Sequence, residues 1–239
     1  MNAQDAERNP PASTTEGATS TTKGSGAGQT RVALIRAGLA LFGRNGFDAT
    51  STRQISTAAK ANIGSIAYHF GGKEGLHAAC ARHIVETVNS VTGPVLAGMP
   101  AVERMAPDDA AAFLSGGLER MADFIVQRPE AGEIVSFVLR ELNRPTAALD
   151  TIYLGVFEPV HRRLCALWAT ATGDDAESER TRIQVFTLIG QIVYFRVARE
   201  AVLRRMDWMA VGPAETAAVT AVARDNLAAI IAARRDARR

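Results

Sequence analysis

Three side chains of the types that bind transition metals lie three residues apart: His77, Cys80 and His83. On a helix this spacing keeps them within about a third of the circumference, and imidazole and thiolate are ligands for soft metals. Cys80, however, also belongs to an apolar stripe with Leu76 and Ile84, and no neighbouring Cys, His or Asp pair completes a tetrahedral set. We therefore interpret the segment as a core helix and expect no metal and no other cofactor.

Other catalytic arrangements are equally hard to find in the sequence. It contains no evident Ser/His/Asp set, no paired carboxylates and no Gly-rich loop that would hold a phosphate. The pattern argues against the alternative of an enzyme of helical fold, so we expect a protein that is not an enzyme.

Basic residues are concentrated in one part of the chain. Residues 31–89 contain seven Lys or Arg against three Asp or Glu, and three of the four His, although the net charge of the whole chain is only +2. A local positive excess beside a near-neutral remainder is typical of a face that contacts nucleic acid.

Composition points to a soluble helical protein of the cytoplasm. Hydrophobic residues make up 47% of the 239, and the abundant Ala and Leu favour helices. No apolar run approaches the length of about 18–20 residues that a membrane span needs, and no signal peptide is recognisable at the N-terminus. Two cysteines, Cys80 and Cys165, give no disulfide framework. We expect a cytoplasmic location and no membrane contact.

The chain is expected to begin with a disordered tail, residues 1–29, because 20 of its first 30 residues are Thr, Ser, Gly, Pro or Ala. Apolar spacing then predicts one long helix and two short ones, over about 31–45, 51–60 and 62–70. Ser51 and Gln54 have the spacing of a capping box, and Asn62 is a second candidate N-cap. A long helix followed by a short helix, a turn and a second short helix is the order of elements in a helix-turn-helix domain.

The remainder also shows helical spacing, and no stretch alternates with the period of a strand. A long helix is expected from Lys73, followed by a connector that opens at Gly93-Pro94. Further helices are predicted at about 108–128, 130–141, 146–170, 180–206 and 214–234. The expected fold is all-α, with an N-terminal three-helix DNA-binding domain over 30–76 and a helical regulatory and dimerisation domain over 77–239.

The N-terminal part resembles the DNA-binding domain of the TetR family of bacterial transcription regulators. The matching stretches are 37–47 (AGLALFGRNGF), 49–55 (ATSTRQI), 62–70 (NIGSIAYHF) and 73–76 (KEGL). The resemblance implies a homodimer whose C-terminal domain binds a small ligand that loosens its hold on DNA.

The C-terminal half resembles a narrower group, the CecR-like regulators. The resemblance rests on 140–146 (RELNRPT), on Ile189, Gly190 and Gln191, and on Phe195-Arg196 with Arg199-Glu200. Arg204 and Trp208 continue the pattern. It does not indicate which ligand binds.

Carried onto this sequence, the DNA contacts of the TetR family fall on ten positions of the helix-turn-helix. Arg53 can bond a phosphate or guanine. Asn62 and Ser65 are short polar residues at the start of the second short helix, where they can contact DNA. Tyr68 and His69 suit phosphate contacts unless they merely cap the core. The ten are Thr52, Arg53, Lys60, Asn62, Gly64, Ser65, Ala67, Tyr68, His69 and Lys73.

Two of these positions depart from the usual pattern of the family. Lys60 stands where the turn normally has Gly, so it either accepts a strained backbone angle at a cost of about 1 kcal/mol or adds a phosphate contact. Ala67 stands where an aromatic residue often reaches the DNA, and its methyl group could pack against a thymine instead.

The last two long helices carry apolar residues on more than one side, so each must be covered on two faces. In 180–206, Ile183, Phe186, Val193 and Val197 share one face, and Val185, Ile192, Phe195 and Val202 share another. The alternatives are a central core helix or, as the family implies, a four-helix dimer interface. In the second helix the interface residues would be Val219, Val222, Leu227 and Ile230.

A small-molecule pocket is expected between helices of the C-terminal domain, although each candidate could equally be plain core. Arg140 and Arg196 each need a partner on a largely apolar helix, which Glu141, Glu200 or an anionic ligand could provide. The pocket candidates are Phe113, Met121, Phe124, Phe137, Arg140, Tyr153, Phe157, Trp168, Gln191 and Tyr194.

The resulting hypothesis is a repressor that binds a palindromic double-stranded DNA operator as a homodimer and is released by a small molecule. A rival from another class is a protein-interaction adaptor whose helix-turn-helix no longer binds DNA, suggested only by Lys60 and Ala67.

Overall fold

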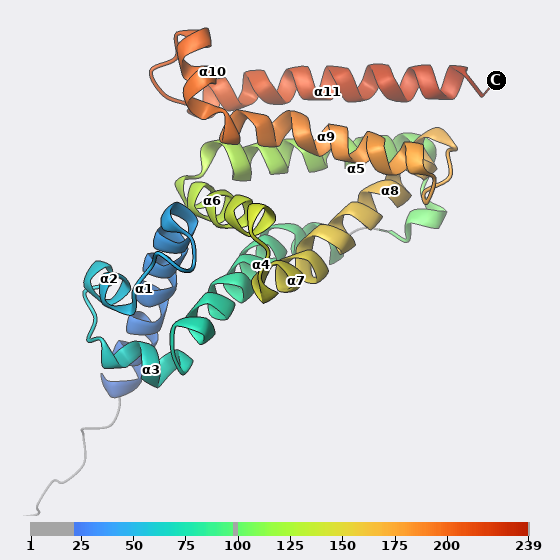
Figure 1. Cartoon of the computed structure of the whole chain (residues 1–239). Helices are drawn as coiled ribbons and strands as arrows, with labels where there is room; N and C mark the ends of the chain where they lie inside the picture. The colour runs from blue at the N-terminus through green and yellow to red at the C-terminus, as the bar shows by residue number, and fades with distance from the viewer. Residues whose placement is uncertain (1–21, 98–99, 239) are drawn as a thin grey trace, which may run out of the picture.

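The computed structural model describes residues 22–97 and 100–238, and all of their regular secondary structure is helical (Figure 1). The N-terminal helices are α1 (Thr22–Asn45), α2 (Thr52–Ala58), α3 (Gly64–Phe70) and α4 (Lys73–Ala97). A short 3-10 turn (Val102–Arg104) precedes the rest, which comprises α5 (Pro107–Ala122), α6 (Pro129–Asn143), α7 (Ala147–Ile152), α8 (Glu158–Thr172), α9 (Glu179–Val197), α10 (Arg199–Met206) and α11 (Pro213–Asp236). The predicted all-α class is confirmed.

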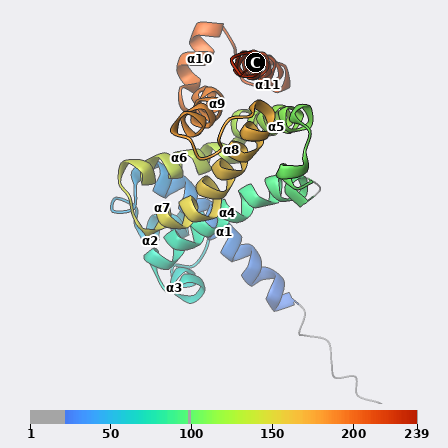
Figure 2. The ribbon, with the colours of Figure 1, turned by 90° about the vertical axis from the view of Figure 1, so that its right-hand side faces the viewer.

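Helix α1 begins earlier than the sequence predicted. Of the expected tail, residues 1–21 lie outside the described residues, but residues 22–29 form the first turns of α1. Extending an existing helix adds one hydrogen bond per residue fixed, so even weak helix formers such as Gly26 and Gly28 can continue it. These turns project from the body of the molecule (Figure 2), and Gly26 to Gln29 are exposed.

Prolines shift helix boundaries away from several predicted positions. The residue before a proline disfavours helical backbone, so Arg128 is extended and α5 ends in a π turn at Asp123–Gln127. Pro159 has no N–H for the carbonyl four residues earlier, and the predicted helix 146–170 is divided there into α7, a π turn (Tyr153–Phe157) and α8.

Two other helix boundaries were predicted wrongly. The Gly93-Pro94 step lies inside α4 rather than opening a connector, because a proline removes a single hydrogen bond from a helix that already has twenty residues. The helix predicted over 180–206 is two helices that meet at Ala198, where no Gly or Pro marks the break.

Two hydrophobic clusters form the core. One joins α1, α2, α3 and α4 to α6 and α7, through residues such as Phe42, Ile66 and Phe137. The other joins α5, α8, α9 and α11, around Trp168 and Ile192. The packing therefore does not divide at residue 76, because α6 and α7 share a core with the helix-turn-helix.

In space, α6 lies between the two halves of the molecule. Figure 1 shows α1, α2, α3 and the first half of α4 at one end and α5, α9, α10 and α11 at the other, and Figure 2 shows the same separation from the side. Helices α1 and α6 pack against each other, and so do α4 and α7. These contacts join α1 and α4 to helices that follow α5 in the chain.

Candidate nucleic-acid interface

A buried threonine fixes the corner between α1 and α2. The Thr50 hydroxyl lies 2.7 Å from the Gly46 carbonyl and 3.2 Å from the Leu41 carbonyl, so it occupies carbonyls at the end of α1. Helix α2 then starts with the predicted capping box: the Gln54 N–H donates to Ser51 Oγ at 3.2 Å, and the Ser51 N–H donates to Gln54 Oε1 at 2.8 Å. This confirms the predicted start of α2 and places Thr52 and Arg53 in its first turn.

The turn after α2 is a Schellman motif with lysine in the position usually held by glycine. The Ala61 N–H donates to the Ser56 carbonyl at 2.9 Å, and the Lys60 N–H donates to the Thr57 carbonyl at 3.1 Å. These bonds require a left-handed residue, and Lys60 has φ of 52°. The strained angle expected of Lys60 is confirmed, and its side chain is exposed.

Helix α3 is short, and three of its seven residues are exposed. It starts at Gly64, two residues after the predicted N-cap, but Asn62 still serves its first turn, because Asn62 Oδ1 accepts the Gly64 N–H at 2.9 Å. Ile66 anchors the helix in the core at 1% exposure, whereas Tyr68 is 83% exposed. Tyr68 therefore does not cap the core, and its ring rests edge-on against His69.

Glycines allow α3 and α4 to meet almost without separation. Gly71 ends α3 with φ of 75°. A Cβ on Gly75 would lie 1.7 Å from the Phe70 carbonyl oxygen, so only glycine fits there. The sequence analysis quoted Gly75 only as part of a motif and missed its steric role.

The ten predicted contact residues lie between the first turn of α2 and the first residue of α4, and none of them is buried. Six are exposed: Arg53, Lys60, Asn62, Gly64, Ala67 and Tyr68. Four are half-buried: Thr52, Ser65, His69 and Lys73. Within the described part of the chain, the Arg53 guanidinium has no hydrogen bond or ion pair, so it is available to a ligand.

Two cations at the edge of this surface are held by aromatic rings. Lys73 Nζ lies 4.3 Å from the centre of the Phe47 ring, and the Arg31 guanidinium lies 5.7 Å from that of Phe70. Such contacts are each worth about 0.5–1 kcal/mol at exposed sites. They fix both charges beside α3, and Arg31 was not among the predicted contacts.

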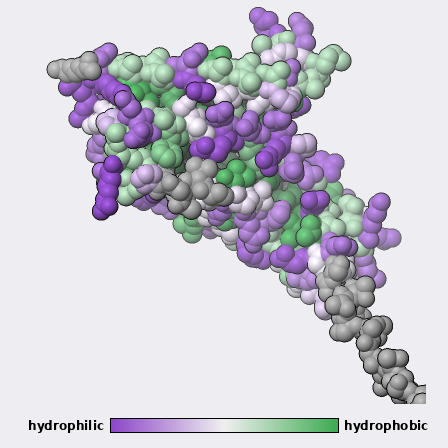
Figure 3. All heavy atoms as spheres, turned by 180° about the vertical axis from the view of Figure 1, so that it is seen from behind, coloured by the Kyte–Doolittle hydropathy of each residue, from purple (hydrophilic) through white to green (hydrophobic). Residues whose placement is uncertain are grey.

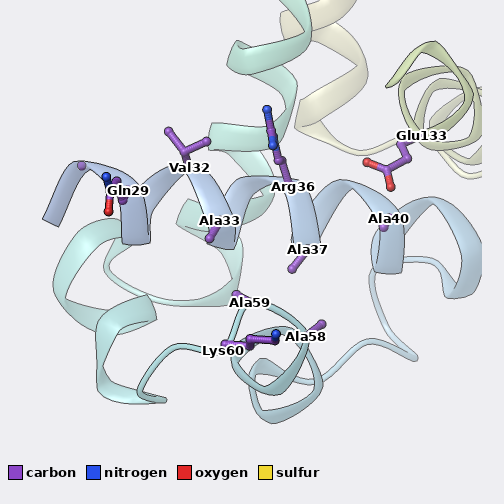
Figure 4. Close-up of a pocket in the computed structure, with 11 residues that line it drawn as sticks. Gln29, Val32, Ala33, Arg36, Ala37, Ala40, Ala58, Ala59, Lys60 and Glu133 are labelled. Carbon is purple, nitrogen blue, oxygen red and sulfur yellow. The ribbon is translucent and has the colours of Figure 1, made fainter. Parts of the chain in front are cut away.

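An open hollow of about 840 Å³ lies next to the turn that carries Lys60. Figure 4 shows alanines of α1, including Ala33 and Ala37, facing the end of α2, with Glu133 of α6 at one edge. Its walls are mainly small apolar side chains, and they offer no convergent set of polar groups that would define a ligand.

The three potential metal ligands on α4 face different surroundings. His77 is buried, with its Nε2 3.2 Å from Glu141 Oε1. Cys80 is fully buried against the Ile35 carbonyl, and burial raises the pKa of its thiol to about 12. His83 is half-buried. Among the described residues, no three His, Cys, Asp or Glu side chains are grouped as metal ligands.

The ten pocket candidates are divided among several places. Phe113 and Met121 pack on the C-terminal cluster, while Phe124, Phe137 and Phe157 belong to the N-terminal one. The remaining candidates lie on the surface or have partners within the protein: Tyr153 and Tyr194 are 50% and 59% exposed, Trp168 donates to Asp174, Asn226 donates to Gln191, and Arg140 contacts α1. None lines the hollow beside Lys60 or the second one, of about 230 Å³ between α5 and α11.

Backbone carbonyls, not carboxylates, are the partners of the two arginines. Arg140 Nη2 donates to the Arg44 carbonyl at 2.6 Å, and Arg196 Nε donates to the Ile125 carbonyl at 2.6 Å. The expectation of Glu141 or Glu200 as the partner was therefore wrong, and the alternative of an anionic ligand stays a prediction. Carbonyls near a helix C-terminus carry partial negative charge that attracts a guanidinium.

The two-faced pattern of the helices after residue 179 is confirmed in part. On α9, Val185 and Ile192 are buried, while Ile183, Phe186 and Val197 are 50–63% exposed. On α11, Val222 is 61% exposed, but Val219 and Leu227 face the core of their own chain and Ile230 is half-buried against it, contrary to the expectation for all three.

Helix α11 also meets the length and hydropathy criteria of a membrane span, contrary to expectation. Arg224 and Asp225 interrupt the apolar run, but the alanines around them keep the mean hydropathy of an 18-residue window at 1.3. A third of that window is buried, and core helices of soluble proteins meet the same criteria. From behind, a band of weakly apolar residues follows the upper edge of the molecule (Figure 3).

Comparisons with known proteins agree with this arrangement. Residues 34–80 match "Bacterial regulatory proteins, tetR family", and residues 110–234 match "HTH-type transcriptional dual regulator CecR, C-terminal domain". The HTH-type transcriptional dual regulator CecR of Shigella flexneri is 34% identical over 184 residues, which cover 76% of this chain and 82% of that protein.

Solved structures share the fold at low identity. A TetR-like transcriptional regulator from Rhodococcus sp. RHA1 superimposes with a TM-score of 0.58 at 16% identity, over 83% of this chain and 96% of that one. AibR, solved with isovaleryl coenzyme A and operator DNA, superimposes with a TM-score of 0.53 at 13% identity, over 70% of this chain and 86% of that one. The structures share the fold, and the family matches together with the 34% identical relative show that the chain belongs to the TetR family, with a C-terminal domain of the CecR type, and is a DNA-binding transcriptional regulator.

Proposed function

We propose that the chain represses transcription by inserting α3 into the major groove of an operator. The observation that carries the proposal is the exposed surface of α2, the turn and α3, where Arg53 bonds no other described residue and Tyr68 projects into solvent. Arg53 can form two parallel bonds to guanine or contact a phosphate, and the Ser65 hydroxyl suits either a base or a phosphate. Ala67 would pack against a thymine methyl group, and the other seven residues of the predicted set would position α3 on the DNA backbone.

The operator is palindromic and the protein binds it as a homodimer. The exposed apolar stripe on α9, made by Ile183, Phe186, Tyr194 and Val197, supports a two-fold interface with α9 and α11 of a second copy. Two recognition helices related in this way are spaced by about 34 Å, one turn of DNA. On this proposal α11 is covered by protein, the regulator is cytoplasmic and no membrane is involved.

A small molecule that binds the C-terminal domain releases the operator by favouring an arrangement in which the two recognition helices no longer fit it. Such a ligand must bind that arrangement more tightly than the DNA-bound one. Its site lies between helices of the C-terminal domain, with Phe113 and Met121 of α5 and Trp168 of α8 as walls.

The proposal is tested with duplexes that the full-length protein selects from a random pool. We expect the selected sequences to be palindromic. Arg53→Ala should weaken binding to the palindrome by at least about 30-fold, because a good pair to guanine is worth about 1–3 kcal/mol and the homodimer loses one in each half-site. Ser65→Ala should also weaken it.

The matched control is Arg205→Ala, which removes an exposed charge from α10, at the opposite end of the molecule. It should leave both affinity and selected sequence unchanged. If the wild type selects no sequence, or if Arg53→Ala binds as tightly as Arg205→Ala, the surface of α2 and α3 does not read DNA, and the adaptor hypothesis would take its place.

A further inference from the structure

A hollow lies between α5 and α11, at the end of the molecule away from the helix-turn-helix. The two helices pack against each other (Figure 2), and the hollow between them has a volume of about 230 Å³. Most of its wall is apolar and is made by Ala111, Leu227, Ala228, Ile231 and Ala232. Among the described residues, the polar side chains that line it are Ser115, Arg224 and Arg235. An apolar wall with a few polar groups is typical of a site for a small molecule.

The guanidinium of Arg235 is only partly paired with acceptors of the protein. Its Nε donates to the Ala171 carbonyl at 2.7 Å, and its Nη1 donates to Asp108 Oδ1 at 2.7 Å. Nη2 is buried and has no hydrogen-bond partner among the described residues. A buried N–H without an acceptor is unfavourable, so Arg235 can gain from a partner that engages both of its terminal nitrogens.

The bond from Arg235 to Asp108 can be exchanged at little cost. The Asp108 side chain is 89% exposed, and exposed ion pairs contribute little to stability. A carboxylate bonded to both terminal nitrogens of an arginine forms the stronger, bidentate pair. In the place of Asp108, such a carboxylate would leave no nitrogen of the Arg235 guanidinium without an acceptor.

Arg224 gives the hollow a second positive charge. It precedes Arg235 by eleven residues, close to three helical turns, so both arginines lie on the same side of α11, about 16 Å apart along its axis. Arg224 is exposed, and within the described part of the chain it has no hydrogen bond or ion pair. Both charged residues that line the hollow are therefore positive, which favours an anionic ligand.

We propose that the hollow binds a small carboxylic acid with an unbranched apolar body, whose carboxylate bonds Nη1 and Nη2 of Arg235 in place of Asp108. The apolar body lies along Leu227 and Ile231. A volume of about 230 Å³ accommodates about eight groups the size of a water molecule, at about 30 Å³ each. The site goes beyond the proposed function, because it shares no wall residue with the effector site proposed above.

Isothermal titration calorimetry of the full-length protein with sodium octanoate tests the site. We expect one octanoate per chain, with a dissociation constant of about 0.1–1 mM for a ligand of about ten non-hydrogen atoms. The alcohol 1-octanol has the same body without the charge, and it should bind at least about 10-fold more weakly because it cannot form the bidentate pair. Inorganic phosphate has charge without the apolar body and should also bind at least about 10-fold more weakly.

Asp108→Asn tests the exchange of partners, because the proposal expects this variant to bind octanoate more tightly than the wild type. Loss of the competing carboxylate should lower the dissociation constant about 3–5-fold, in the range of an exposed ion pair. The matched control is Asp109→Asn, which removes the neighbouring exposed carboxylate in the first turn of α5. It should change the affinity by less than about 2-fold, because its charge is screened by solvent.

A second pair of variants tests where octanoate binds. Ala228 lines the hollow and is exposed, so Ala228→Leu should fold normally and fill part of the hollow. It should weaken octanoate binding by at least about 10-fold, since the apolar body and the new side chain cannot occupy the same space. Ala112→Leu makes the same change at an exposed position of α5 that does not line the hollow, and it should bind octanoate as the wild type does.

Four results would overturn the proposal. Failure of octanoate to bind at about 5 mM shows that the hollow is not a site for such acids. Equal affinity for octanoate and 1-octanol shows that the carboxylate is not recognised. Equal affinity of the wild type and Ala228→Leu places octanoate elsewhere, and an Asp108→Asn protein that binds no more tightly shows that the ligand does not replace Asp108. None of these results bears on DNA binding, so the proposed function is tested separately.

Discussion

Lys60 combines a conformational cost with a position at the centre of the proposed DNA surface. Its φ of 52° places a residue that has a Cβ in the left-handed region, which costs about 1–2 kcal/mol for a residue other than glycine. The exposed ammonium group lies in the turn between α2 and α3. Retaining lysine there is reasonable if its charge contributes to binding.

Replacing Lys60 separates the two effects. Lys60→Gly should exceed Lys60→Ala in free energy of unfolding by up to about 1 kcal/mol, since the relief is partly offset by the greater freedom of glycine in the unfolded chain. Urea denaturation measures this difference. Both variants lose the same charge, so both should lower the salt slope of operator binding by about two, one for each protomer of the homodimer, if Lys60 contacts a phosphate.

Equal stability of the two variants would show that the turn is not strained. An unchanged salt slope in both would show that the Lys60 charge faces no phosphate.

At the level of single residues, local rules predicted much of the site and failed where a partner is distant in sequence. Ser51 with Gln54 and the left-handed Lys60 follow from chain neighbours, and both predictions are confirmed. Arg140 and Arg196 bond carbonyls 96 and 71 residues away. A sequence identifies a charge that needs a partner but does not show that the partner is a helix end.

Among the elements, the loop between α8 and α9 is held by the end of α11. Asp174, at 8% exposure, accepts bonds from Arg234 at 2.6 and 3.1 Å and from Arg238 at 3.2 Å, and Trp168 Nε1 donates to it at 3.1 Å. The bonds from Arg234, more than those from Trp168, outweigh burial and hold the pKa of Asp174 well below its usual range. The charged form of Asp174 therefore stabilises the fold.

This carboxylate should make stability depend on pH in acid. Because its pKa is lower in the folded state, its contribution is present above the unfolded value of about 4 and is lost as pH falls below it. Asp174→Asn keeps an acceptor for Trp168 but loses the charge, and should lower the free energy of unfolding by about 2 kcal/mol at pH 7. The difference from wild type should shrink at pH 3, as measured by urea denaturation at both values.

Asp48→Asn, which removes an exposed carboxylate, is the control and should change stability little at either pH. A deficit of Asp174→Asn that is equal at pH 7 and pH 3 would show that the Asp174 charge is not what stabilises the loop.

Helices were predicted well where apolar spacing is strong and poorly where a proline or a tertiary contact sets the boundary. The capping box of α2 and the left-handed end of α8 at Gly173 follow from local residue types. Pro159 divides a predicted helix, whereas Pro94 does not end one. The same residue type has opposite outcomes because the surrounding packing determines whether a single lost hydrogen bond can be tolerated.

For the whole molecule, the apolar pattern indicated two-faced helices but not which chain covers each face. Val219 and Leu227 belong to the core of their own chain, while Phe186 and Val222 are left exposed. Periodicity reports only that a residue is apolar and on which side it lies. The three-dimensional packing is needed to show which apolar side remains uncovered and is available to a second copy.

The uncovered face of α9 leads to a prediction for the assembly. Phe186 is 63% exposed and stacks on His161 with ring centres 4.0 Å apart. Burying a phenylalanine is worth about 1.5–3 kcal/mol, and two-fold symmetry places it in the interface twice. Phe186→Asp should therefore raise the dimer dissociation constant at least about 100-fold and yield monomers in sedimentation experiments at micromolar concentration.

The same variant should bind a full palindrome much more weakly while retaining its affinity for a single half-site, because each helix-turn-helix remains intact. Leu154→Asp, an equally exposed apolar residue outside α9 and α11 at 66% exposure, is the matched control and should sediment as the wild type does. A Phe186→Asp protein that keeps the dimer mass would show that the copies meet through another surface, and the spacing argument for the palindrome would then have to start from that surface.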